Sequence, residues 1–298
     1  MAAPEDTSGG SPASEAPLEI RFWGVRGSVP TPQADRLRYG GNTACVEMRC
    51  GAHRLIFDAG TGLASLGQTV QGNGPVVFDL FLSHTHLDHI NGLPFFGPIF
   101  DPANEIGIWA GHLGADESLM QVLRRIMSPP IMPIPLEAMQ AARRFIEFAP
   151  GNRLEPKPGV VLNTHALNHP DGAIGYRVEH GGCDACYITD IEHNDAGANA
   201  RLADFVRGTQ VMIYDATYTD AEYQADKVGW GHSTWQQALI LAERAGVETC
   251  VLFHHAPEHS DADMDAIANA AQAARPGTIV AREGMVLSLN RTGCAVSG

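Results

Sequence analysis

A short stretch of the sequence holds four side chains that can bind a metal ion. It follows an apolar run over 76–82 that is typical of a buried strand. The four side chains are His84, His86, Asp88 and His89. Imidazole and carboxylate groups suit zinc, but one tetrahedral ion cannot easily use all four from so short a loop. We therefore predict two neighbouring metal ions, a pair that could clamp the attacking and leaving oxygens of an in-line displacement.

Side chains of the same types stand at the ends of other predicted strands. His169 follows an apolar run over 160–167, Asp190 ends a second strand, and His254 and His255 follow a third. Any one of these alone would more often be a surface or capping residue. Together with the first loop they form a candidate ligand set, in which Asp190 would bridge both ions. The alternative, a His-rich polar loop without a metal, leaves these downstream residues unexplained.

Two further polar residues could support such a site. Asp58 ends a strand predicted over 53–57 and precedes glycines, so it could accept a hydrogen bond from a metal-bound histidine or cap the next helix. His232 precedes Ser233 and Thr234, either of which would cap a helix predicted over 235–245. The positive end of that helix would then lie near His232, where an anion is favoured. A capping or core role is the alternative for His232.

The elements that must position these side chains alternate along the chain in two similar halves. Strands are predicted over 18–25, 44–48, 53–57, 76–82, 105–110, 160–167, 175–179, 185–190, 211–214, 250–253 and 285–289. Helices are predicted over 63–68, 117–127, 136–142, 200–206, 235–245 and 263–274. This order indicates an α/β fold of two packed sheets with helices outside, so that ligands at successive strand ends gather at one edge.

One segment, 112–150, has the character of an insertion. Its proline-rich centre, 128–135, cannot be regular helix or central strand. We interpret the insertion as a cap over the pocket or a contact with a second subunit. A loop that only covers the core is the alternative.

Composition narrows the class of protein. The chain has 298 residues, 44% of them apolar, which is typical of one large globular domain or two small ones. Its formal net charge of −14 argues against stable nucleic-acid binding but not against a small anionic substrate. Residues 1–17 lack the features of a signal peptide and are predicted to be a disordered tail. No apolar run reaches membrane-spanning length, so we expect a cytoplasmic protein.

The six cysteines are not expected to form disulfides, since no export signal is apparent. Cys183 and Cys186 form a single C-x-x-C pair beside a predicted hairpin tip. A redox pair or half of a zinc site is one interpretation. Two ordinary thiols are favoured, because no second C-x-x-C completes a tetrahedral site.

These residues together resemble a known family. The set resembles the five motifs of the metallo-β-lactamase fold superfamily: Asp58, the His84-x-His86-x-Asp88-His89 loop, His169, Asp190 and a late histidine at a strand end. The resemblance covers 18–289 and implies an αββα sandwich, with 18–298 forming one metallohydrolase domain. It also implies two Zn²⁺ ions per subunit, with Mn²⁺ as an alternative.

Within the superfamily, several motifs resemble the phosphodiesterase branch, which includes ribonuclease Z and small cyclic-nucleotide phosphodiesterases. They are Asp88, Asn168-His169, Tyr214-Asp215-Ala216-Thr217 and His232-Ser233-Thr234. Ribonuclease Z carries a glutamate where Asp215 stands, and a Gly- and Pro-rich arm where this chain has only a short hairpin after His169. The N-terminal motif around Trp23 is more similar to the cyclic-nucleotide group. The family spacing favours His254 over His255 as the last ligand.

The resemblance implies a function and a role for each residue. One zinc would be held by His84, His86, His169 and Asp190, and the other by Asp88, His89, His254 and Asp190. A hydroxide formed at zinc would attack phosphorus of a 3′,5′-cyclic nucleotide, with Asp88 at the catalytic centre. His232, oriented by Asp215, would protonate the leaving alkoxide.

Other outcomes stay open at this point. They are a tRNA 3′-processing endonuclease, a small-ester or lactone hydrolase that needs no His232, and a metal-binding sensor on a decayed hydrolase fold. Family members are often dimers, so a homodimer is expected.

Overall fold

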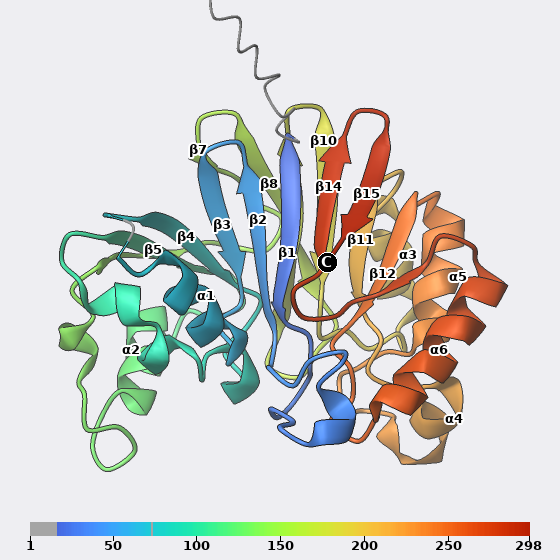
Figure 1. The fold of residues 1–298 in the computed structure, drawn as a ribbon, viewed down its shortest axis with the longest axis horizontal. Helices are drawn as coiled ribbons and strands as arrows, with labels where there is room; N and C mark the ends of the chain where they lie inside the picture. Colours follow the sequence, from blue (N-terminus) through green and yellow to red (C-terminus); the bar gives the residue numbers. More distant parts are fainter. Residues whose placement is uncertain (1–16, 73) are drawn as a thin grey trace, which may run out of the picture.

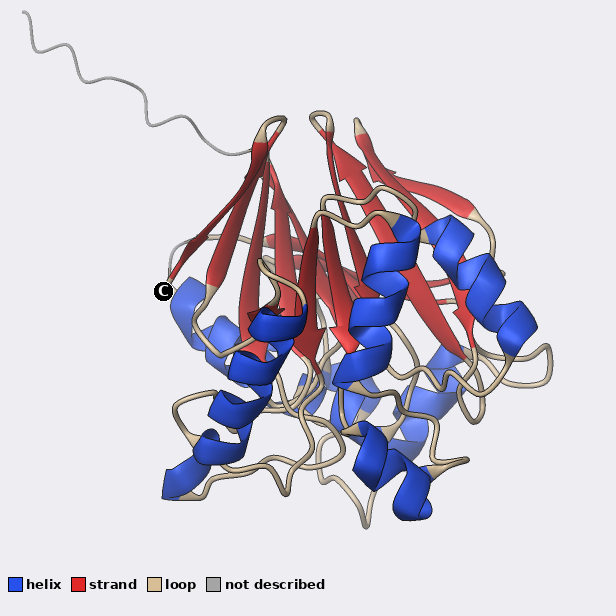
Figure 2. Cartoon of the chain, turned by 90° about the vertical axis from the view of Figure 1, so that its right-hand side faces the viewer, coloured by secondary structure: helices blue, strands red, loops and turns tan. Residues whose placement is uncertain are grey.

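Two β-sheets lie face to face at the centre of the structure, and helices cover the outer face of each sheet (Figures 1 and 2). The computed structural model describes residues 17–72 and 74–298. The helix–sheet–sheet–helix order confirms the predicted α/β sandwich. The predicted disordered tail, 1–17, lies outside the described residues except for Pro17.

The first sheet has eight strands in the order β15-β14-β1-β2-β3-β4-β5-β6. They are β1 (Leu18–Gly24), β2 (Cys45–Cys50), β3 (His53–Phe57), β4 (Val77–Leu82), β5 (Glu105–Ala110), β6 (Ala142–Glu147), β14 (Val286–Asn290) and β15 (Gly293–Ser297). Strands β3 to β6 run parallel to one another, and the remaining pairs are antiparallel.

The second sheet has seven strands in the order β13-β12-β11-β10-β9-β8-β7. They are β7 (Arg153–Lys157), β8 (Val160–Leu167), β9 (Ala173–His180), β10 (Cys183–Ile188), β11 (Val211–Asp215), β12 (Thr249–Phe253) and β13 (Ile279–Val280). Buried and partly exposed residues alternate along much of β8, whereas every residue of β11 is buried. A continuous apolar run suits β11 because it is a parallel strand covered on both faces.

Helices on the two outer faces belong to different parts of the chain. The α-helices are α1 (Gly62–Val70), α2 (Leu119–Ile126), α3 (Ala196–Phe205), α4 (Asp220–Glu222), α5 (Trp235–Ala245) and α6 (Asp261–Ala274). Short 3₁₀ helices are η1 (Ala34–Arg36), η2 (Leu87–His89), η3 (Leu93–Phe95), η4 (Gly97–Phe100) and η5 (Leu136–Ala138), and a π-helix, η6, spans Tyr223–Lys227. Helices α1 and α2 pack on the first sheet, and α3, α5 and α6 on the second (Figure 1).

Apolar side chains fill the space between the two sheets. They include Phe57 and Phe81 from the first sheet and Tyr176, Tyr187 and Phe253 from the second, all of them fully buried. Because this core holds β4 against β10 and β12, the polar residues that follow these strands meet at one edge of the sandwich.

One predicted helix is wrong. The segment 136–142 forms only the 3₁₀ helix η5, and Ala142 begins strand β6 instead. Strand β6 pairs in parallel with β5 and forms the edge of the first sheet. The segment 112–150 therefore contributes α2 and an edge strand to the fold. Its predicted contact with a second subunit stays a prediction.

The C-x-x-C cysteines point to opposite faces of β10. Cys183 lies in the core between the sheets, whereas Cys186 lies under the helices of the second sheet. Residues three apart on a strand face opposite ways, so these thiols cannot share a metal or a disulfide. Burial raises the pKa of the Cys186 thiol to about 12. The interpretation as two ordinary buried thiols is the one that fits.

Among residues 17–72 and 74–298, no helix combines the length and the apolar character that a membrane crossing requires.

Candidate metal centre

The residues predicted to bind metal meet at one edge of the sandwich. They come from the loops after β4, β8, β10 and β12. Potential ligand atoms lie within 4.8 Å of one another in several overlapping triplets, among them His84–His86–His169, His84–His89–Asp190 and Asp88–His89–His254. Side chains up to 170 positions apart are thus brought together, as their positions at strand ends predicted.

Three residues, Asp88, His89 and His254, form what we call the inner donor group with one oxygen of Asp190. The Nε2 atoms of His89 and His254 lie 3.3 Å apart. Each lies 3.2–3.5 Å from the Oδ2 atoms of Asp88 and Asp190. Zinc–ligand distances of about 2.0–2.1 Å correspond to tetrahedron edges of about 3.3–3.4 Å. The inner donor group therefore fits a tetrahedral zinc ion.

The other three histidines, His84, His86 and His169, form the outer donor group with the second oxygen of Asp190. The Nε2 atoms of His84 and His169 each lie 3.8 Å from Asp190 Oδ1. His86 turns its Nδ1 atom inward, 3.1 Å from His169 Nε2. His84 Nε2 is buried yet has no hydrogen-bond partner among the described residues. A buried nitrogen without a partner is costly, and a metal ion at this position would satisfy it.

Asp190 stands between the two donor groups. Its Oδ1 atom faces the outer group and its Oδ2 atom faces the inner one. Thr189 donates a hydrogen bond of 2.7 Å to Oδ2 and so fixes the carboxylate. A carboxylate divided in this way can bridge two ions, and the bridging role of Asp190 stays a prediction.

Each inward-facing histidine is held by its other ring nitrogen. Asp58 Oδ2 lies 2.8 Å from His89 Nδ1 and also accepts from Ser83 and Tyr187. The contact predicted for Asp58 is thus present, whereas helix α1 begins after Thr61 and makes no side-chain cap. Such outer contacts fix the tautomer of a ligating histidine and raise its basicity.

The remaining rings are held in the same way. His84 Nδ1 lies 3.0 Å from Ser83 Oγ, and His169 Nδ1 donates to the carbonyl of Gly231 over 2.7 Å. His86 Nε2 lies 3.3 Å from Asp171, whose side chain is 87% exposed.

His254 and His255 occupy different environments. His254 points into the inner donor group, and its Nδ1 atom lies 3.0 Å from Thr217 Oγ1. His255 turns away, with Nε2 bonded to the carbonyl of Ala281 at 2.8 Å. The geometry therefore makes His254 the candidate ligand of the two.

Burial and neighbouring charges shift the pKa values of the donor side chains. Burial raises the pKa of Asp88 and Asp190, but neighbouring histidines outweigh it and hold both pKa values well below the usual range. Burial lowers the pKa of His84 and of His169. Both carboxylates are thus ionised and these two rings neutral, which are the forms that bind metals. For His89, burial lowers the pKa, but the surrounding carboxylates outweigh it and raise it well above the usual value.

His232 forms a pair with Asp215 beside the donor groups. Its Nδ1 atom lies 3.0 Å from Asp215 Oδ2 and 3.7 Å from Asp190 Oδ1, and its ring stacks on that of His254 at 5.0 Å. Burial lowers the pKa of His232, but Asp215, Asp190 and Asp88 outweigh it and raise the pKa to about 9. Thr234, rather than Ser233, caps helix α5, as one of the two alternatives predicted.

Backbone conformation marks the same edge. In the part of the chain that the structure describes, the non-glycine residues with positive φ are Ser28, Asp58, Asp171, Asp190 and His254. Ser28 donates its amide to Asp88 over 2.8 Å, and the other residues belong to the donor groups or contact their histidines. Unfavourable backbone conformations cluster at functional sites, so this distribution independently points to the metal centre.

The sequence of this chain matches a known family over most of its length. The family model described as "Beta-lactamase superfamily domain" matches residues 53–255. The chain belongs to the beta-lactamase superfamily. With its convergent donor groups, it is a metal-dependent hydrolase of the metallo-β-lactamase fold.

Individual proteins are similar to the chain at lower identity. A ribonuclease Z from Mycobacterium marinum is 26% identical over 267 residues, covering 80% of this chain and 87% of that protein. Among solved structures, a diphosphatase of the PhnP family has a TM-score of 0.68 at 15% identity and covers 92% and 98% of the two chains. Zn²⁺-bound PqqB from Methylobacterium extorquens has a TM-score of 0.66 at 16% identity, covering 91% and 100%. These structures share the metallo-β-lactamase fold.

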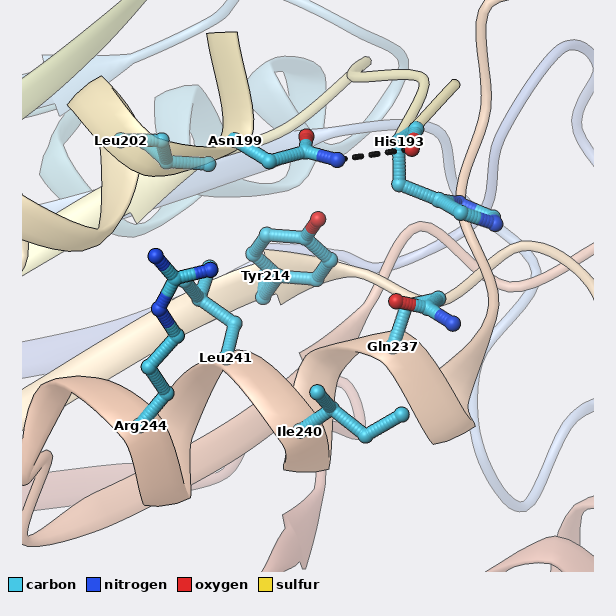
Figure 3. A pocket seen from close by; sticks show the side chains of 8 residues that line it. All are labelled: His193, Asn199, Leu202, Tyr214, Gln237, Ile240, Leu241 and Arg244. Atoms are coloured by element: carbon cyan, nitrogen blue, oxygen red, sulfur yellow. Dashed lines mark hydrogen bonds between the residues drawn. The ribbon is translucent and has the colours of Figure 1, made fainter. Parts of the chain in front are cut away.

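A separate pocket of about 90 Å³ lies between α3, β11 and α5 (Figure 3). Tyr214, Gln237 and Arg244 line it, and it does not contain any residue of the donor groups. Two of the residues that line it contact Ser233, the neighbour of His232: His193 Nδ1 lies 3.0 Å and Tyr214 Oη lies 3.4 Å from Ser233 Oγ.

Some contributors were not predicted from sequence. Thr217 donates to Asp215 Oδ1 over 2.7 Å and contacts His254, so it connects the pair around His232 with the inner donor group. Gly27 packs on the His254 ring, where a Cβ atom would lie 2.4 Å from Cε1. The Asp-x-Thr spacing at the end of β11 was the available signal for Thr217, since an aspartate side chain commonly accepts from the backbone two residues further on, as Asp215 Oδ1 does from the Thr217 amide over 3.0 Å.

Proposed function

We propose that this hydrolase is a dinuclear-zinc phosphodiesterase that cleaves 3′,5′-cyclic nucleotides to nucleoside monophosphates. The observation that carries the proposal is the placement of Asp190. Its two oxygens face two separate donor groups, and the His232–Asp215 pair stands at the side of one of them.

The chain's own residues fit two metal ions. Asp88, His89, His254 and Asp190 would hold one, and His84, His86, His169 and Asp190 the other. When bound, the ions would supply a nucleophile from water near neutral pH and neutralise charge on the phosphoryl oxygens. Metal analysis would distinguish zinc from manganese.

His232 would act as the general acid. Its Nδ1 atom is engaged by Asp215, so Nε2 is the nitrogen that remains to donate a proton. In the hydrolysis one P–O bond of the cyclic diester breaks, water supplies the new oxygen on phosphorus, and the departing alkoxide takes the proton from His232. Proton transfer of this kind contributes roughly 10²–10⁴-fold to a rate.

A small substrate is favoured over a large one by two features. The segment between His169 and Asp190 is only the β9–β10 hairpin, without an extended arm. The net charge of −14 disfavours the phosphate contacts that dominate nucleic-acid affinity.

A second candidate is a tRNA 3′-processing endonuclease of the same chemistry. The similarity to ribonuclease Z from Mycobacterium marinum favours it. It predicts cleavage of precursor tRNA and an affinity that falls steeply with salt. A small-ester hydrolase would share the metals but would not require His232.

A substrate panel tests the proposal. Zinc-loaded protein is assayed against 3′,5′- and 2′,3′-cyclic nucleotides, precursor tRNA and lactones, with metal content measured on the same sample. Turnover of a 3′,5′-cyclic nucleotide well above that of the other substrates is expected. Preferential cleavage of precursor tRNA or of a lactone would overturn the proposal in favour of the respective alternative.

We also propose a homodimer, as the resemblance implied. Light scattering at several protein concentrations measures the mass directly, and a mass of 31.9 kDa throughout would exclude it.

A further inference from the structure

One buried carboxylate near the metal centre has no role in the chemistry described so far. Glu192 lies two residues after Asp190 and is 4% exposed. No ion pair of Glu192 is present among the described residues. Burying a carboxylate without a cation is unfavourable unless hydrogen bonds replace its hydration. The partners of Glu192 therefore indicate what this residue does.

Glu192 accepts hydrogen bonds from one loop and one aromatic residue. Its Oε1 atom accepts from the amide of Gly229 at 2.6 Å and from Tyr223 Oη at 2.7 Å. Its Oε2 atom accepts from the amide of Gly231 at 3.2 Å. Both carboxylate oxygens are thus used to fix the backbone of residues 229–231, which we call the clamp loop.

The clamp loop contacts the ring of His169 and leads directly into His232. The carbonyl of Gly231 accepts the hydrogen bond from His169 Nδ1 over 2.7 Å, and His232 is the next residue along the chain. A Cβ atom at Gly231 would lie 2.5 Å from His169 Nδ1, so the backbone packs against the ring. The φ angles of Gly229 and Gly231, 89° and 83°, are ones that few other residues adopt. A glycine-rich loop of this kind needs an external partner to stay in one conformation.

The backbone of Glu192 ties the same region to the outer donor group. Its amide donates to the carbonyl of Asn168 over 2.8 Å, and Asn168 Nδ2 donates to its carbonyl over 2.9 Å. Glu192 therefore connects three segments through its side chain and its backbone: residues 168–169, 190–192 and 229–232.

We propose that Glu192 is a positioning residue that sets the orientation of both His169 and His232 through the clamp loop. The role for His232 rests on the proposed phosphodiesterase function, whereas the role for His169 concerns metal affinity alone. A carboxylate suits this task because each of its oxygens can accept a hydrogen bond. A glutamine of the same size has only one accepting oxygen, so it cannot hold both glycine amides.

The test compares Glu192→Gln with the wild type on two substrates of the same centre. One is bis(p-nitrophenyl) phosphate, whose aryl leaving group departs without a proton. The other is a 3′,5′-cyclic nucleotide, whose alkoxide leaving group requires His232. We expect the rate ratio of cyclic nucleotide to aryl diester to fall about tenfold or more in the variant. Zn²⁺ affinity, measured by competition with a chelator, should weaken about 10–100-fold because His169 loses its fixed orientation.

Tyr223→Phe is the matched control. It removes the phenol hydrogen bond to Glu192 and leaves both glycine amides in place, so the rate ratio and the Zn²⁺ affinity should stay within about threefold of wild type. Circular dichroism confirms that each variant is folded.

The outcomes separate this inference from the proposed function. A Glu192→Gln protein with the wild-type rate ratio and the wild-type Zn²⁺ affinity overturns the inference, as does an equal loss in Tyr223→Phe. If the wild type cleaves the aryl diester but no cyclic nucleotide, the proposed function fails. The Zn²⁺ affinity then decides the role of Glu192 on its own, and an unchanged affinity overturns it.

Discussion

The two donor groups that share Asp190 differ in burial and in how closely their ligand atoms match the geometry around a bound ion. In the inner group, the measured separations among the nitrogens and oxygens span only 3.2–3.5 Å, and His89 and His254 are fully buried. In the outer group the corresponding separations span 3.1–3.8 Å, and the His86 side chain is 41% exposed. The inner group is therefore closer to the geometry of a bound ion.

The contacts behind the two groups differ in the same sense. Asp58, behind His89, is fully buried and accepts four hydrogen bonds, two of them from Ser83 and one from Tyr187. Asp171, behind His86, is largely exposed. The inner donor group would therefore hold a metal ion more tightly than the outer donor group, which lies closer to solvent.

The largest effect on metal content and turnover is expected for a substitution of Asp190, which belongs to both donor groups. Asp190→Ala removes an oxygen from each group, so both metals should be lost. Turnover should fall by at least about 1,000-fold, because Lewis-acid stabilisation of several kcal/mol disappears. Metal analysis and activity on the same sample check this. Retention of two equivalents of metal would show that each group is sufficient without the shared carboxylate.

His232→Ala should separate chemistry from metal binding. It removes a neighbour of both groups but a donor of neither, so metal content should stay at the wild-type level. Turnover of alkoxide-leaving substrates should fall by roughly 10²–10⁴-fold, the usual contribution of a general acid. If zinc and activity are lost together, His232 has a structural or ligating role instead.

A matched pair of substitutions tests the difference between the two groups directly. Asp58→Asn should weaken metal affinity about 10–100-fold, because His89 loses a buried anionic partner. Asp171→Asn should change affinity less than about threefold, since its hydrogen bond is exposed to water. Chelator competition measures both. Equal effects would show that burial does not distinguish the two groups.

The smallest effect on metal content is expected for a substitution of His255, which follows His254 in the chain. His255→Leu alters the neighbour of His254 that faces away from the donor groups, so metal content should be unchanged. Loss of the buried hydrogen bond to Ala281 should lower the free energy of unfolding by about 1–3 kcal/mol. Denaturant unfolding and metal analysis report the two quantities separately. Loss of metal in this variant would reverse the choice between His254 and His255.

Much of this arrangement could be predicted from the sequence, because it depends on patterns of residues that are close together in the chain. Strands such as β4 and β12 are apolar runs that end abruptly at His84 and His254, so their position and their exposed ends follow from the pattern. Asp58 could be placed behind a ligating histidine because a carboxylate at a strand end is well suited to that contact.

Other features depend on contacts that no local pattern carries. Strand β6 contains Ala142 and Phe145 after a segment of good helix formers, and it is a strand because β5 offers it an edge. Strand β7 contains Pro156, which is tolerated because β7 is an edge strand and its pairing with β8 is irregular between Leu154 and Lys157. The role of Glu192 depends on glycines 37 and 39 positions away in the chain.

The positive φ angles around the metal centre have a consequence for comparing relatives. Each costs about 1 kcal/mol or more in a residue such as His254, and glycine would relieve that cost. A lineage that no longer needed catalysis would gain stability by accepting glycine at positions 190 and 254. Glycine at these positions in a homologue would therefore signal that the enzyme activity has been abandoned while the scaffold persists.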